Sequence, residues 1–176
     1  GMPPEQVKVI LLDTRFSRDS HIIPSVGGMR FPLSPLVAAS VRGFCSHCSI
    51  GADFEGDVLG SEQWDWLDSQ LADSEAAVHI IVSSIQVQTS NPLVESWGHF
   101  PASRARLINL LNKHRPAGLL LISGDVHFAE MSGSNANDHQ LQQDMERQDQ
   151  DGRSEAANGV AAPSASSLLE VTSSGM

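Results

Sequence analysis

The chain has 176 residues, with 21 acidic against 11 basic side chains and a formal net charge of −10. A charge of this sign argues against a general nucleic-acid-binding surface, and no apolar run approaches the roughly 18 residues that a membrane-spanning helix requires. The length suits one domain or part of one, and it indicates neither an oligomeric state nor a compartment.

The first expected strand is the apolar run at residues 7–12, which ends in the charged segment DTRFSRD. Arg15 and Arg18 are three residues apart, so one helical or turn-like step places both guanidinium groups on one side. Paired guanidinium groups match the geometry of phosphate in a way that lysines do not. The alternative is a structural cluster of salt bridges in which Asp13 and Asp19 pair with the two arginines.

Residues 22–54 contain several prolines and glycines that break any period, which predicts a long surface excursion with a short helix at residues 35–42. This segment carries Cys45 and Cys48, with His47 between them. A C-x-x-C pair can be redox-active or half of a zinc site, but the chain has no second such pair to complete a tetrahedral site. We interpret both residues as loop cysteines, with a local metal or disulfide role as the alternative.

An amphipathic helix is expected next, because Trp64, Leu67 and Leu71 recur at helical spacing. Ser61 is expected to cap its amino end, where acidic residues also suit the helix dipole. Trp64 and Trp66 are interpreted as packing residues.

The β-branched run at residues 78–82 predicts a second strand, which continues into a polar segment that includes Gln86. The loop at residues 89–99 then carries Trp97 and His99. Loops at strand ends often line binding sites. In the alternative, the tryptophan only anchors the loop and the histidine is a surface residue.

A second helix is expected to begin at Pro101, which suits a first helical position, and its apolar stripe contains Leu107, Leu110 and Leu111. The order of strand, excursion, helix, strand, helix and strand is typical of an α/β layer with crossover helices.

The apolar run at residues 119–122 predicts a strand buried on both faces, and it ends in the string SGDVH. If the chain continues extended from Asp125 to His127, the two side chains point the same way and can reach one point. In open α/β sheets, ligands collect beyond the carboxyl ends of the strands. The pair is therefore a candidate for metal chemistry, the alternative being an Asp that caps backbone amides beside a surface His.

Composition changes after Met131. Residues 132–167 are rich in small and polar side chains, contain no aromatic residue and show no apolar period, which predicts a disordered insertion. The apolar run at residues 168–172 predicts a last strand. We therefore assign residues 1–131 and 168–176 to one domain and residues 132–167 to the insertion.

Six blocks of the sequence resemble, in this order, the carboxy-terminal half of the PhoD-like alkaline phosphatases. They are LLDTRFSRD, LGSEQWDWLDSQL, HIIVSSIQV, ESWGHFPASRARLINLL, LLLISGDVHFAEM and LLEVTSSGM. The resemblance implies part of a metallophosphatase-like α/β/β/α sandwich that hydrolyses phosphate monoesters or diesters with metal ions, calcium and iron being those expected from the family.

The resemblance also implies roles for six residues. These are Asp125 and His127 as metal ligands, Arg15 and Gln86 as catalytic residues, and Arg18 and Trp97 as substrate-binding residues. His99 is a further substrate-binding candidate from its place in the strand-end loop.

In the family, further metal ligands come from earlier blocks, namely an aspartate block, a GD-x-x-Y block and a W-D-D-H block, and none of these occurs in this sequence. Two residues cannot hold a metal cluster that activates water, so this chain alone is expected to be inactive. One alternative is a non-catalytic, truncated α/β interaction module with an acidic disordered segment. Another is a zinc-dependent interaction module built on Cys45, His47 and Cys48.

Overall fold

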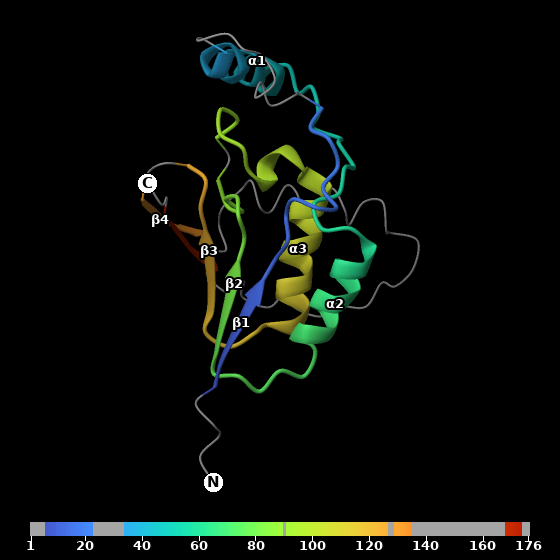
Figure 1. The fold of residues 1–176 in the computed structure, drawn as a ribbon, viewed down its shortest axis with the longest axis vertical. Helices are drawn as coiled ribbons and strands as arrows, with labels where there is room; N and C mark the ends of the chain where they lie inside the picture. Colours follow the sequence, from blue (N-terminus) through green and yellow to red (C-terminus); the bar gives the residue numbers. More distant parts are fainter. Residues whose placement is uncertain (1–5, 23–33, 90, 127–128, 135–167, 174–176) are drawn as a thin grey trace, which may run out of the picture.

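A computed structural model describes residues 6–22, 34–89, 91–126, 129–134 and 168–173. The described strands form one five-stranded sheet of order β1-β2-β3-β5-β4, in which β4 alone is antiparallel to its neighbour (Figure 1). The strands are β1 (Val7–Leu11), β2 (Val78–Val82), β3 (Leu119–Ser123), β4 (Glu130–Ser134) and β5 (Leu168–Thr172). The helices are α1 (Ser34–His47), α2 (Ser61–Leu71), the 3-10 turn η1 (Trp97–His99) and α3 (Pro101–His114).

Both predicted crossover helices lie on the same side of the sheet (Figure 1). Side chains alternate between the two faces of a strand, and the strands pair in register. Residues from neighbouring strands therefore form a row on the face toward the helices, with Ile10 beside Ile81 and Ile81 beside Leu121. These side chains form one buried core with Trp64 of α2 and Leu107 of α3. Burying a side chain of this size stabilises the fold by about 1.5–3 kcal/mol.

The opposite face of the sheet is apolar but is not covered by the described residues. Val9, Leu11 and Met131 are 62%, 71% and 73% exposed. The prediction that β3 is buried on both faces was therefore wrong for this face, where Ile122 is only partly buried. Parallel sheets are ordinarily covered on both sides, and the α/β/β/α arrangement places a second sheet against such a face.

The amino end of α2 differs from the prediction. Ser61 lies inside the helix, and the N-cap is Gly60, with φ at 76° and no side-chain capping bond. Asp57 instead holds the segment just before the helix: its Oδ2 accepts the N–H of Gly60 at 3.0 Å and its Oδ1 accepts the N–H of Val58 at 2.7 Å. The prediction that Trp66 is a packing residue was also wrong, because this residue is 43% exposed.

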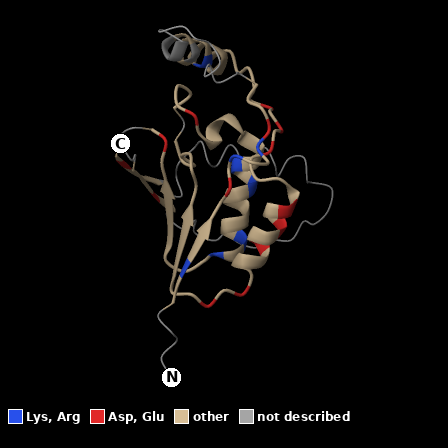
Figure 2. Cartoon of the chain, viewed as in Figure 1, with Lys and Arg blue, Asp and Glu red and all other residues tan. Residues whose placement is uncertain are grey.

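Figure 2 shows acidic residues on α2 beside basic residues on α3. Asp68 joins the two helices, since its Oδ1 accepts hydrogen bonds from Lys113 Nζ at 2.9 Å and His114 Nε2 at 2.5 Å. Lys113 and Asp68 are well exposed, so their ion pair stabilises the fold by at most about 1 kcal/mol.

The excursion contains a longer helix than expected. Helix α1 includes Cys45 and His47, so the interpretation of Cys45 as a loop residue was wrong, while Cys48 lies in the turn that follows. Both thiols are free. Figure 1 shows α1 beyond the edge of the sheet toward which the parallel strands point.

The predicted start of the insertion was three residues early, because residues 132–134 belong to β4 and pair with β5. Residues 135–167, for which disorder was predicted, lie outside the described residues. Among the described helices, none combines the length and apolar character needed to cross a membrane.

Candidate active site at the carboxyl ends of the strands

Polar residues follow β1, β2 and β3 at the same edge of the sheet. Because these strands are parallel and in register, the segments that begin at Asp13, Ser83 and Gly124 emerge side by side. The hydroxyl groups of Thr14 and Ser84 are hydrogen-bonded, which joins the ends of β1 and β2. This edge is where ligands bind in open α/β sheets.

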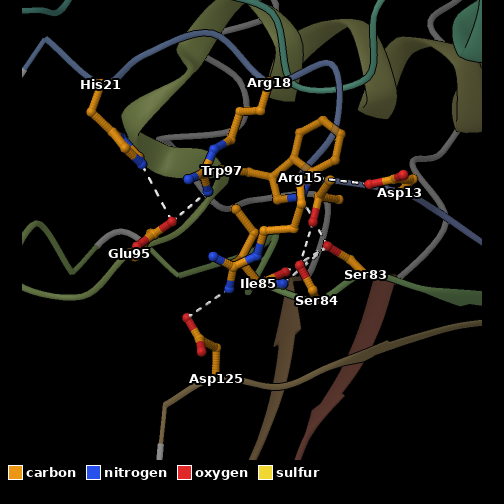
Figure 3. Close-up of polar contacts among 11 residues, drawn as sticks. Asp13, Arg15, Arg18, His21, Ser83, Ser84, Ile85, Glu95, Trp97 and Asp125 are labelled. Carbon is orange, nitrogen blue, oxygen red and sulfur yellow. Dashed lines mark hydrogen bonds and ion pairs between the residues drawn. The ribbon is translucent and has the colours of Figure 1, made fainter. Parts of the chain in front are cut away.

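Arg15 and Asp125 meet across this edge, although they are 110 residues apart in the sequence. Arg15 Nη2 lies 3.4 Å from Asp125 Oδ2, and the two side chains are 54% and 42% exposed (Figure 3). Asp13 fixes the backbone that carries the Arg15 side chain. Its Oδ1 accepts hydrogen bonds from the backbone N–H groups of Arg15 at 2.9 Å and Phe16 at 3.0 Å. These two bonds hold the pKa of Asp13 below its ordinary value.

Asp125 and His127 were expected to lie together only if the backbone is extended at Asp125. The backbone there is not extended. Its φ is 75°, in the left-handed region, so the expectation that Asp125 begins an extended segment was wrong. Aspartate is one of the few non-glycine residues that enter this region readily, because its short side chain can bond locally. His127 lies outside the described residues.

Gln86 is almost completely buried behind the exposed edge. Its Nε2 donates to Thr172 Oγ1 and to Glu130 Oε2, both at 3.1 Å, while its Oε1 has no hydrogen-bond partner within the described part of the chain. The next two residues are held by the fully buried Glu170, whose carboxylate accepts the N–H of Val87 at 2.8 Å. Gln86 is therefore fixed by β4 and β5.

Arg18 does not join Arg15 at the exposed edge. Its guanidinium donates to Glu95 Oε1, and His21 Nε2 lies 3.4 Å from the same oxygen (Figure 3). The contacts with His21 and Arg18 outweigh desolvation and lower the pKa of Glu95 to about 2. This is an ion-pair cluster of the kind weighed as an alternative, but its acid comes from the loop after β2 rather than from Asp13 or Asp19.

Trp97 and His99 lie in the turn η1 that follows Glu95. Trp97 is fully buried, and its indole N–H donates to Ser83 Oγ at 3.0 Å. His99 Nε2 lies 3.1 Å from the carbonyl oxygen of Pro92, which can only accept, so this nitrogen carries the proton. Burial lowers the pKa of His99 below its ordinary value of 6.5. Trp97 and His99 are therefore held by bonds to Ser83 and to the carbonyl oxygen of Pro92.

Several polar residues at this edge were not singled out from the sequence. They are Thr14, Ser83, Ser84, Glu95, Ser123, Glu130 and Thr172. The available signal was a serine or threonine at the end of three apolar runs, at Ser83, Ser123 and Thr172. Ser123 and Thr172 lie opposite each other in the sheet, and their hydroxyl groups bond at 2.8 Å. Glu95 carried no comparable signal, because its partner is distant in sequence.

The described residues do not form a complete metal site. No group of three or more His, Cys, Asp or Glu side chains among them is arranged to hold a metal ion. Asp125 can offer carboxylate oxygens to a cation, but calcium alone takes six to eight oxygen ligands. Further ligands would have to come from residues outside the described part.

Comparison with known proteins supports the fold and the family. The chain is 30% identical over 78 residues to alkaline phosphatase D of Bacillus subtilis (strain 168), a match that covers 40% of this chain and 13% of that protein. It superposes on a solved structure described as PhoD with a TM-score of 0.56 and 19% identity, over 97% of this chain and 27% of that one. This match confirms the α/β fold of metallophosphatase-like class. The chain thus spans well under two thirds of either relative.

The family comparison covers almost the whole chain. The model of the PhoD-like phosphatases matches residues 5–169, which include the ends of β1, β2 and β3. The chain therefore belongs to the PhoD-like phosphatase family.

Proposed function

We propose that this chain forms the carboxy-terminal part of a metal-dependent phosphatase or phosphodiesterase that hydrolyses phosphate esters, and that it is inactive alone. The observation that carries this proposal is the meeting of Arg15 and Asp125 at the carboxyl edge of the sheet. A cationic group for phosphate and a carboxylate for a cation lie there at contact distance, in a member of the PhoD-like phosphatase family.

Arg15 is suited to bind the phosphate of the substrate. Its ion pair with Asp125 is long and exposed, and such pairs contribute about 0–1 kcal/mol. The guanidinium can therefore exchange this contact at little cost for a bidentate, charge-assisted pair with phosphate oxygens, which is the stronger interaction.

Asp125 and His127 are the proposed metal ligands, with calcium and iron as the proposed ions. A bound metal ion lowers the pKa of a coordinated water and offsets charge on the phosphoryl group. The described residues do not by themselves complete a site for these ions. The chain's own contribution is to hold Asp125 beside Arg15.

Gln86, Arg18, Trp97 and His99 are proposed to support the site from behind. Gln86 remains a proposed catalytic residue. Its buried Oε1, which has no partner among the described residues, can only accept, so it suits a protonated group rather than a phosphate oxygen. The other three are held by Glu95, Ser83 and Pro92. We propose that they determine the shape of the substrate pocket.

The test is the hydrolysis of a chromogenic phosphodiester by the intact protein. Asp125→Asn keeps the shape of the side chain and should lower kcat/KM by about 1,000-fold or more, because it removes a charged ligand. Arg15→Ala should lower kcat/KM by about 10- to 100-fold, mainly through KM, since a guanidinium binds phosphate without holding the metal.

Arg115→Ala is the matched control. Arg115 is exposed and is the C-cap of α3, just before β3 begins, so it lies away from the carboxyl edge of the sheet. Full activity of Asp125→Asn would contradict the ligand role, and unchanged kinetics of Arg15→Ala would assign this residue to structure. An intact protein that binds no metal and hydrolyses no ester would favour the interaction module instead.

Residues 135–167 are proposed to be an insertion that the domain does not need. Deleting residues 135–165 should leave the urea midpoint of the chain nearly unchanged, because an unstructured segment buries little apolar surface. A loss of several kcal/mol on deletion would show that this segment packs against the domain.

A further inference from the structure

Glu95 is a mostly buried carboxylate that joins two segments of the site. It precedes η1 in the loop after β2, whereas Arg18 and His21 belong to the segment after β1. Both basic side chains contact the same oxygen, Oε1: Arg18 Nη1 donates to it, and His21 Nε2 lies 3.4 Å away (Figure 3).

This cluster is much less exposed than the ion pairs elsewhere in the described chain. The side chains of Arg18, Glu95 and His21 are 16%, 17% and 7% exposed. Charges in such surroundings interact more strongly than charges in water, and removing one partner leaves the other desolvated without compensation. The cluster is therefore a firm connection, in contrast to the exposed pair of Arg15 and Asp125.

The cluster fixes one end of the segment that carries Arg15. The other end is fixed where Gln63 Oε1 accepts the N–H of Asp13 at 2.8 Å. Between these ends Arg15 turns toward Asp125, while Arg18 turns toward Glu95 (Figure 3). Since the contact of Arg15 with Asp125 is weak, the direction of its guanidinium depends on how well the backbone of this segment is held.

We infer that Glu95 is a positioning residue, which acts through Arg18 to hold the Arg15 guanidinium at the carboxyl edge of the sheet. This inference rests on the proposed function, in which Arg15 binds phosphate. It assigns no contact between Glu95 and the substrate. The ionised carboxylate is what matters, so a neutral side chain of the same shape should not replace it.

The test compares Glu95→Gln, Arg15→Ala and the double variant in the intact protein. The readouts are KM and kcat for a chromogenic phosphodiester and the inhibition constant of inorganic phosphate. Glu95→Gln should raise KM and the phosphate inhibition constant by about 10-fold, with a smaller change in kcat, because misplacing a binding group by a fraction of an ångström has effects of this order. In the Arg15→Ala background, Glu95→Gln should change KM and the phosphate inhibition constant by no more than about twofold. The effects of substitutions at two residues that act as a unit are not additive.

Asp68→Asn is the matched control, because Asp68, like Glu95, contacts two basic side chains through one carboxylate oxygen but joins α2 to α3. It should leave KM and the phosphate inhibition constant unchanged. A merely structural role for Glu95 would predict a similar loss in both Arg15 backgrounds, and that result would overturn the inference.

The outcomes separate the inference from the proposed function. If Arg15→Ala itself leaves KM and phosphate inhibition unchanged, the proposed role of Arg15 fails, and the inference fails with it. If Arg15→Ala has its effect but Glu95→Gln has none, only the inference is overturned. Should Glu95→Gln not fold, Arg18→Lys provides the same comparison, because it keeps the charge but loses the planar guanidinium. Unchanged constants in Arg18→Lys and in Arg18→Ala would then overturn the inference.

Discussion

The carboxylate of Asp57 should contribute more to stability than any other acid near α2. Its Oδ1 accepts hydrogen bonds from Trp64 Nε1 at 2.7 Å and from Ser103 Oγ at 2.8 Å, which joins the start of α2 to α3. Trp64 and Ser103 are both buried. Burial acts to raise the pKa of Asp57, but these bonds and those from nearby backbone N–H groups outweigh it, so the pKa lies below its ordinary value of 3.8.

The expected loss follows from the donors that would be left without a partner. Asp57→Ala leaves the buried indole N–H of Trp64 unpaired, at about 1–3 kcal/mol. It also leaves the Ser103 hydroxyl only its longer bond to the carbonyl oxygen of Gly56, at 3.3 Å. Because Asp57 is partly exposed and water can replace some of these bonds, we expect a total loss of about 2–4 kcal/mol. Asp57→Asn should cost about 1–2 kcal/mol, since its amide oxygen can replace Oδ1 while its NH2 group faces the N–H of Gly60.

The pH dependence has a definite sign. A carboxylate whose pKa is lowered by folding stabilises the folded state above the unfolded pKa, and this contribution is lost as pH falls toward the folded pKa. The wild type should therefore lose its advantage over Asp57→Asn as pH falls below 3.8, the ordinary pKa.

The assay is urea denaturation of the purified chain, followed by tryptophan fluorescence, at pH 7 and at several lower pH values. Asp65→Asn is the control, because Asp65 is exposed on the same helix. A loss below about 0.5 kcal/mol for Asp57→Ala at pH 7, or a gap to Asp57→Asn that does not narrow on acidification, would refute this reasoning.

Three further substitutions test how the chain is held at other points. Gly118→Ala should destabilise the chain by about 1–3 kcal/mol in urea titrations, because φ is 55° and an added Cβ would lie 2.8 Å from the carbonyl oxygen of Ala77; equal stability would show that the turn relaxes freely. Trp97→Phe should cost about 1–3 kcal/mol, since the ring stays buried while the bond to Ser83 is lost; a thermal midpoint equal to that of the wild type would contradict it. Glu170→Gln should cost about 1–3 kcal/mol and speed amide exchange at Val87 or Gln88, whose N–H groups lie 2.8 and 2.7 Å from the two carboxylate oxygens. Unchanged exchange at both residues would show that Glu170 does not hold their backbone.

Local sequence determined the elements of this fold. The strands at residues 78–82 and 168–172 and the helix start at Pro101 were predicted at the observed positions, because apolar periodicity and the fixed φ of proline act over a few residues. The α/β class followed from their order. Helix α1 was predicted too short mainly at its carboxyl end, since it continues through Gly43 to His47 although glycine has a low helix propensity.

The site depended on contacts that no local pattern contains. The pairing of Arg15 with Asp125 spans 110 residues, and that of Arg18 with Glu95 spans 77. The residues at both strand ends were candidates from sequence, but only the parallel register of β1, β2 and β3 decided which of them meet. The linkage of α2 to α3 through Asp57 and the left-handed backbone at Asp125 were likewise decided by tertiary structure, because burial and hydrogen bonding to distant segments outweigh the small intrinsic preferences of single residues.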